Sequence, residues 1–148
     1  LAGFIVGVIC SLIGTQIMGE FGPLVTLRIA IGSGLAFLTA QLLDVGIFSA
    51  LRGGTWWRAP LASTLVGSTV DTALFFTIAF SASLTWIEPA NDVSWAGDVL
   101  PVLGFGPMAP LWVSLAVADW MVKLSLALIA LVPFRLIIGR IERENSTA

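Results

Sequence analysis

The stretch APLWVSLAVADWMVKLSLALIALV, residues 109–132, decides the fold class of this chain. Its only ionisable residues are Asp119 and Lys123. A run of roughly 20 predominantly apolar residues can cross the hydrocarbon core of a bilayer as a helix. We therefore predict a transmembrane helix over residues 109–138, in which Pro133 should introduce a kink or end the regular part.

Three further apolar stretches precede this one, and no strand-type alternation of apolar and polar residues competes with a helical interpretation. The first carries a stripe of small residues at three- and four-residue spacing, which is typical of close helix packing in membranes. The sequence therefore predicts an all-α, polytopic transmembrane helical bundle that forms one domain over residues 1–148. Its predicted spans are residues 1–18, 24–51, 60–86 and 109–138.

Composition excludes several classes of protein. Apolar residues make up 57% of the chain and charged residues 11%, whereas soluble domains carry about 25% charged residues. The formal net charge of −2 provides no basic surface for nucleic acid. The chain has no histidine and a single cysteine, Cys10, so an internal disulfide is impossible, and we expect neither a metal site nor a cofactor.

The loop charges predict how the bundle is oriented. Cytoplasmic loops of membrane proteins collect Lys and Arg, and the segment after the second span holds Arg52 and Arg58. The long loop over residues 87–108 holds three acidic residues and no basic residue. We therefore expect residues 52–59 and the C-terminal tail to be cytoplasmic and the acidic loop to lie outside.

Apart from Arg135, which belongs to the basic C-terminal segment, five charged side chains fall within the predicted spans, where each costs about 2.5 to 3.5 kcal/mol at the bilayer centre. Arg28 lies near the outer end of its span, so it can either snorkel to the interface or be buried. Asp119 and Lys123 are four residues apart on one helical face, which predicts an ion pair. That pair is either structural, or Lys123 acts as a movable counter-charge for Asp119, Asp71 or Asp44.

Asp44 and Asp71 have similar surroundings on adjacent, antiparallel spans. Each has a polar residue three positions before it, Gln41 in the first case, and a phenylalanine four positions after it, Phe48 or Phe75. Positions spaced in this way lie along one helical face. These carboxylates either hold the helices together by interhelical hydrogen bonds or recognise a solute in the inner half of the bundle. The mid-span aromatic residues are correspondingly either packing residues or flat walls for a ligand.

Several ordered motifs in the second and third spans resemble the queuosine-precursor transporter family, also called the vitamin uptake transporter family. They are RIAIGSGLAF at residues 28–37, QLLD at 41–44, FSALR at 48–52, WWR at 56–58, ST at 63–64, VDT at 70–72 and FF at 75–76. Ser68 stands where many relatives carry a larger amide.

The resemblance implies a six-helix inner-membrane fold, related to the substrate-binding subunits of energy-coupling-factor vitamin importers, of which four spans are visible here. It further implies that about two N-terminal helices and a polar motif between them are missing. The expected activity is import of a small planar solute, 7-cyano- or 7-aminomethyl-7-deazaguanine. A guanine-like edge presents several N–H donors, which carboxylate and amide oxygens can accept. The candidate substrate-binding residues are Gln41, Asp44, Phe48, Asp71, Phe75, Asp119 and Lys123.

Two other functions compete with transport of a queuosine precursor. Paired carboxylates inside a membrane also suit an aspartyl protease, but Asp44 and Asp71 lack the Gly-x-Gly-Asp signature of that class, so we expect no enzyme. The chain could instead transport another vitamin-like molecule, or serve as a structural or assembly subunit with a helix-packing partner or a second copy of itself. The energy source of transport, whether protons, facilitated diffusion or an ATPase module, stays open.

Overall fold

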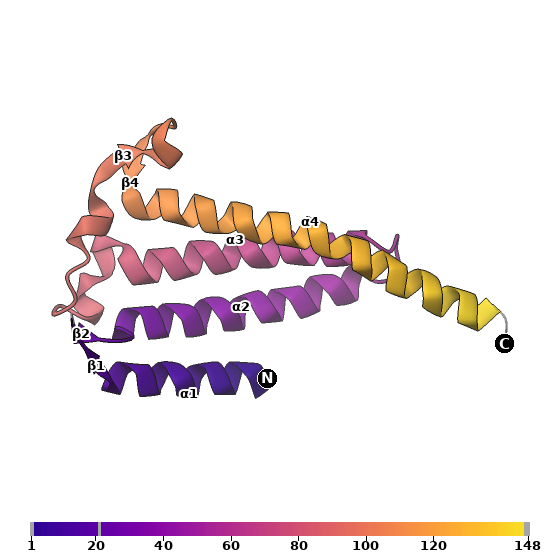
Figure 1. The fold of residues 1–148 in the computed structure, drawn as a ribbon, viewed down its shortest axis with the longest axis horizontal. Coiled ribbons are helices and arrows are strands. Elements are labelled where there is room, and N and C mark those ends of the chain that lie inside the picture. Colours follow the sequence, from indigo (N-terminus) through magenta and orange to yellow (C-terminus); the bar gives the residue numbers. More distant parts are fainter. Residues whose placement is uncertain (1, 21, 147–148) are drawn as a thin grey trace.

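The computed structural model describes residues 2–20 and 22–146. Helices run side by side in an up-and-down arrangement, each antiparallel to its neighbour in the sequence (Figure 1). This confirms the predicted all-α class and the helical bundle. The four helices are α1 (Ala2–Gln16), α2 (Leu27–Leu51), α3 (Arg58–Phe80) and α4 (Leu111–Ser146).

Three helices of the described chain are long and apolar enough to cross a membrane. They are α2, α3 and the part of α4 from Leu111 to Ile137. Helix α1 is also apolar, but its 15 residues span only about 22 Å at 1.5 Å per residue, less than the roughly 30 Å of a hydrocarbon core. The chain is thus a multi-pass membrane protein.

Small residues allow α2 and α3 to pack closely. Gly32 and Ala36 on α2 are buried, as are Ser63 and Gly67 on α3. A Cβ atom added to Gly32 would already touch the side chain of Ile78 at 3.4 Å. Since lipid tails are as apolar as leucine, close backbone approach of this kind is a main source of stability between helices in a membrane.

A capping side chain sets where α2 begins, and a change of backbone conformation sets where α3 ends. Helix α2 begins at Leu27, not at residue 24, because the Thr26 hydroxyl accepts a hydrogen bond from the Ile29 N–H and caps the helix. Helix α3 ends at Phe80, not at residue 86, because Ser81 adopts an extended backbone. A separate 3₁₀ segment, η1 (Ala82–Ile87), follows it.

The fourth helix is longer than predicted. It begins at Leu111, directly after Pro110, and continues through Pro133 to Ser146. The prediction that the regular helix could end at Pro133 is therefore wrong. Proline removes one backbone donor and crowds the preceding turn, but neighbouring groups and small local adjustments let membrane helices tolerate it.

Short strands that the sequence did not predict shape both loops at one end of the bundle. Strands β1 (Met18–Gly19) and β2 (Gly22–Pro23) form a hairpin between α1 and α2, in which Gly22 has φ of +124°. The long loop contains two further 3₁₀ segments and one antiparallel strand pair. These are η2 (Ser94–Gly97), β3 (Val99–Pro101), η3 (Val102–Gly104) and β4 (Met108–Pro110).

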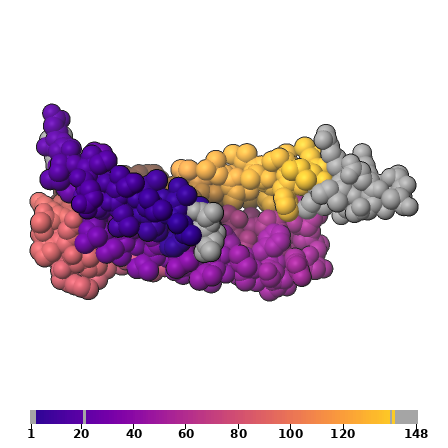
Figure 2. All heavy atoms as spheres, turned by 90° about the horizontal axis from the view of Figure 1, so that it is seen from below, coloured from indigo at the N-terminus to yellow at the C-terminus, as the bar shows by residue number. Residues whose placement is uncertain are grey.

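The first helix covers only half of the bundle. It packs against α2 next to the loops that carry the strands, and it reaches about halfway along that helix (Figures 1 and 2). Of its small-residue stripe, Gly14 makes a close approach, since an added Cβ would lie 2.6 Å from the Val25 side chain. Gly3 and Gly7 meet no such neighbour among the described residues; they line a cavity instead.

Candidate functional site

A charged cluster joins α3 to α4 in the middle of the bundle. The Lys123 ammonium lies 2.5 Å from Oδ2 of Asp119, one turn away on the same helix, and 2.7 Å from Oδ2 of Asp71 on α3. The predicted Asp119–Lys123 ion pair is therefore confirmed. Asp71 joins it as a second carboxylate, so that one cation is shared between two anions, each of the three side chains being between 24% and 34% exposed.

Two threonines extend this cluster, and sequence reasoning missed both as site residues. The Thr72 hydroxyl donates to Oδ2 of Asp119 at 2.7 Å and accepts from Lys123 at 3.1 Å. The Trp120 indole N–H donates to the Thr69 hydroxyl at 2.9 Å. Thr69 and Thr72 are three residues apart on α3, a spacing that places them on one helical face and that could have pointed to them.

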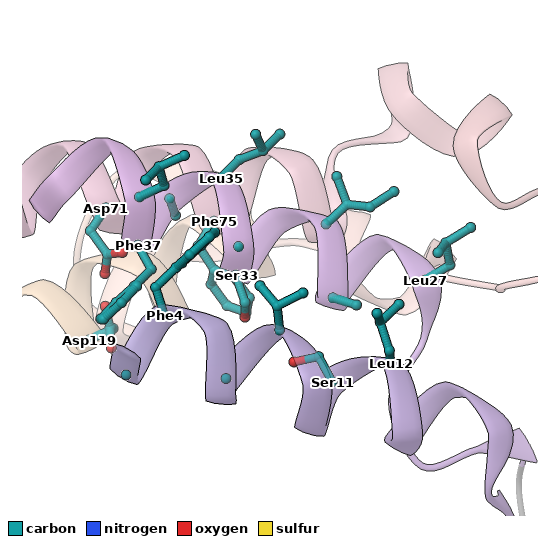
Figure 3. Close-up of a pocket in the computed structure, with 18 of the residues that line it drawn as sticks. Phe4, Ser11, Leu12, Leu27, Ser33, Leu35, Phe37, Asp71, Phe75 and Asp119 are labelled. Atoms are coloured by element: carbon teal, nitrogen blue, oxygen red, sulfur yellow. The ribbon is translucent and has the colours of Figure 1, made fainter. Parts of the chain in front are cut away.

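The cluster lies at one end of a cavity of about 770 Å³, which is large enough for a drug-sized ligand. All four helices contribute to the lining. Figure 3 shows Asp71 and Asp119 at one end and Leu12 and Leu27 towards the other. Because α2 contributes only residues 27 to 38, the cavity occupies the half of the bundle next to the long loop.

Aromatic side chains form part of the cavity wall close to the charges. Phe4 of α1 and Phe37 of α2 are nearly parallel, with an interplanar angle of 5° and ring centroids 6.2 Å apart (Figure 3). Phe75 also lines the cavity, and it makes edge-on contacts with Phe76 and Phe80. A flat apolar surface beside acceptor oxygens can hold a planar, polar-edged molecule.

Of the seven candidate residues, Asp71, Phe75, Asp119 and Lys123 meet at this cavity. Gln41, Asp44 and Phe48 lie farther along α2 and are outside the described lining. Gln41 and Phe48 are exposed. Their part in binding, and that of Asp44, stays a prediction.

Asp44 packs against the neighbouring helix rather than into the cavity. Its carboxylate lies against Gly67 of α3, where an added Cβ would come within 2.5 Å of Oδ1. That oxygen is buried and has no hydrogen-bond partner among the described residues. The similar sequence patterns around Asp44 and Asp71 thus lead to different surroundings.

Arg28 is fully buried, so it does not snorkel to the interface. Its guanidinium donates to the carbonyl oxygens of Ile78 at 3.1 Å and of Ser81 at 2.8 Å, which lie at the C-terminal end of α3. The Arg28 backbone N–H donates to the Glu88 carboxylate. A cation suits unpaired carbonyls at a helix C-terminus, so Arg28 fastens the start of α2 to the end of α3.

No group of three or more side chains that could hold a metal ion occurs within residues 2–20 and 22–146. The charges of the cluster are instead balanced partly by Lys123. The fold and the site together define a polytopic membrane protein with a solute-sized cavity that ends on a charged cluster.

Comparison with known proteins identifies the family of this membrane protein. Residues 2–138 match the family described as "Putative vitamin uptake transporter", and the chain belongs to this family. No solved structure matches it.

The chain is similar to three curated proteins that are named as transporters. It is 38% identical over 107 residues to the "Probable queuosine precursor transporter" of Haemophilus influenzae and 36% identical over 107 residues to the "Queuosine precursor transporter" of Escherichia coli. It is 29% identical over 109 residues to the corresponding protein of Bacillus subtilis. The matches cover 72%, 72% and 70% of this chain but only 37%, 39% and 38% of those proteins.

Proposed function

We propose that this chain is the substrate-binding part of an inner-membrane transporter that imports a queuosine precursor, 7-cyano- or 7-aminomethyl-7-deazaguanine. The observation that carries the proposal is the cavity with aromatic walls and a carboxylate-rich end. A deazaguanine is flat, which suits the Phe4 and Phe37 rings, and it carries N–H donors, which suit Asp71 and Asp119. Family membership and the names of the relatives support the same function.

We propose that the cavity opens towards the outside of the cell. The two connections at the end of the bundle next to it, between α1 and α2 and between α3 and α4 (Figure 1), contain Glu20, Glu88, Asp92 and Asp98. The connection between α2 and α3 at the other end contains Arg52, next to Arg58 at the start of α3, and the Arg135 guanidinium lies over the Trp56 ring of that connection. The Ser94 backbone N–H donates to the Asp92 carboxylate at 2.9 Å and lowers the pKa of that group, which keeps it charged. An acidic end outside and a basic end inside agree with the distribution of Lys and Arg in membrane proteins.

Uptake assays can test the proposed function. Cells that obtain deazaguanines only from the medium should accumulate a labelled precursor when they express the protein. Replacing Phe37 with alanine should lower uptake about tenfold, because stacking of a base on an aromatic ring contributes roughly 1 to 3 kcal/mol. Phe105→Ala is the matched control, since Phe105 is 87% exposed in the long loop.

Unchanged uptake by a well-expressed Phe37→Ala variant would remove this cavity as the binding site. If the unmodified protein takes up another vitamin-like solute but neither deazaguanine, that solute class, and not a queuosine precursor, is its substrate.

A further inference from the structure

We infer that the charged cluster selects a positively charged ligand, so that the protein prefers the aminomethyl precursor over the cyano precursor. The inference rests on the proposed function and adds a rule for discrimination at the same site. It follows from the net charge of Asp71, Asp119 and Lys123 and from the hydrogen bonds that these groups already make.

The cluster carries more negative than positive charge. Two carboxylates contribute −2 and one ammonium contributes +1, which leaves −1 at the end of the cavity. Arg28, the cation of α2, instead donates hydrogen bonds to carbonyl groups at the end of α3. Among the described residues, Lys123 is thus the only cation that contacts either carboxylate.

The donors of the cluster are already used. An ammonium group has three N–H donors, and Lys123 has three acceptors within 3.1 Å, on Asp71, Thr72 and Asp119. The Thr72 hydroxyl donates to Asp119. A ligand therefore finds no free donor in this cluster.

Acceptor oxygens, in contrast, remain available. All the contacts of Asp71 and Asp119 within the described chain use their Oδ2 atoms. Their Oδ1 atoms are left without a hydrogen bond in the described residues, and both side chains line the cavity. The cluster can therefore accept N–H groups from a ligand, and it gains most from an N–H group that is charged.

The two precursors differ only in the substituent at position 7, which is a nitrile in one compound and an aminomethyl group in the other. A primary amine is protonated at neutral pH, as in lysine, whereas a nitrile is neutral and offers only an acceptor. The attraction between a ligand ammonium and one net negative charge about 5 Å away, at an effective dielectric constant of about 20, changes the binding constant by roughly a hundredfold. Desolvation of the ammonium opposes this gain, so we expect a preference of at least about tenfold.

Competition between the two compounds tests the inference in cells that express the full protein. Each unlabelled compound is titrated against labelled aminomethyl compound, and the ratio of the two inhibition constants is the readout. Asp119→Asn makes the cluster neutral while leaving Lys123 paired with Asp71, so its ratio should fall close to one. Asp71→Asn is an independent variant with the same expected result. Asp98→Asn removes the same charge from the exposed loop and should keep the wild-type ratio.

The ratio separates charge selection from other effects of the substitutions. Loss of an acceptor oxygen or partial misfolding weakens the uptake of both compounds and leaves the ratio unchanged. A wild-type ratio near one, or an unchanged ratio in both Asp variants, would overturn the inference while the proposed function stands. If the wild-type protein takes up neither compound, the proposed function fails, and the inference fails with it.

Discussion

Replacing Lys123 with methionine should destabilise the bundle much more than replacing Asp119 with asparagine. The Lys123 ammonium contacts two carboxylates and one hydroxyl at 2.5, 2.7 and 3.1 Å. Methionine fills a similar volume but leaves Asp71 and Asp119 as neighbouring carboxylates without a cation. Removing one partner of a buried ion pair costs about 3 to 5 kcal/mol. Because these side chains are partly exposed, we expect the lower end, about 3 kcal/mol.

Asp119→Asn leaves Lys123 paired with Asp71 and keeps a polar partner for Thr72. Its expected cost is about 1 kcal/mol, the usual net value of a single hydrogen bond. The double variant leaves one carboxylate without a cation, so its stability should lie between those of the two single variants. The double variant should therefore be more stable than Lys123→Met alone, although it carries an additional substitution.

Thermal unfolding in detergent can measure these differences, with the fluorescence of the six tryptophans as the signal. At about 2 to 4 °C for each kcal/mol, Lys123→Met should lower the melting temperature by roughly 6 to 12 °C and Asp119→Asn by roughly 2 to 4 °C. If the losses in the double variant simply add, the two residues do not interact, and the shared-cation description is wrong.

Two further predictions concern the ends of the bundle. A cysteine placed at Ser94 in a Cys10→Ser background should react with a membrane-impermeant maleimide added outside the cell, and labelling only after the cytoplasmic side is opened would reverse the proposed orientation. Arg28→Met should lower the melting temperature by roughly 6 to 12 °C, because the carbonyl groups of Ile78 and Ser81 each lose a charged donor that contributes about 1.5 kcal/mol, the lower end of the usual range. Arg52→Met, on an exposed loop, is the matched control, and equal effects of both substitutions would show that Arg28 does not fasten the two helices.

Hydropathy predicted the helices well but not where they end. Long apolar runs are sufficient to locate helices in a membrane protein, and all four were found in this way. The ends depend on individual side chains, such as Thr26 at the start of α2, and on backbone conformations, such as that of Ser81 after α3. Helix α4 does not end at Pro133, because local adjustments and neighbouring groups let membrane helices tolerate proline, whereas the alternative of a kink there stays a prediction.

The candidate site could be predicted only in part. Spacing within one helix is fixed by the sequence, so the pairing of Asp119 with Lys123 was accessible. Contacts between helices also depend on how each helix is rotated about its axis, which a polar residue in an apolar helix does not determine by itself. For this reason the similar patterns around Asp44 and Asp71 gave no indication that only Asp71 would reach Lys123.

The contact between Asp44 and Gly67 restricts how this protein can change during evolution. Any side chain at position 67 would occupy the space that the Asp44 carboxylate fills, since even a methyl carbon would come within 2.5 Å of Oδ1. A substitution at Gly67 can therefore persist only together with a smaller or displaced side chain at position 44. These two positions should therefore vary together, with glycine retained wherever the aspartate keeps this conformation.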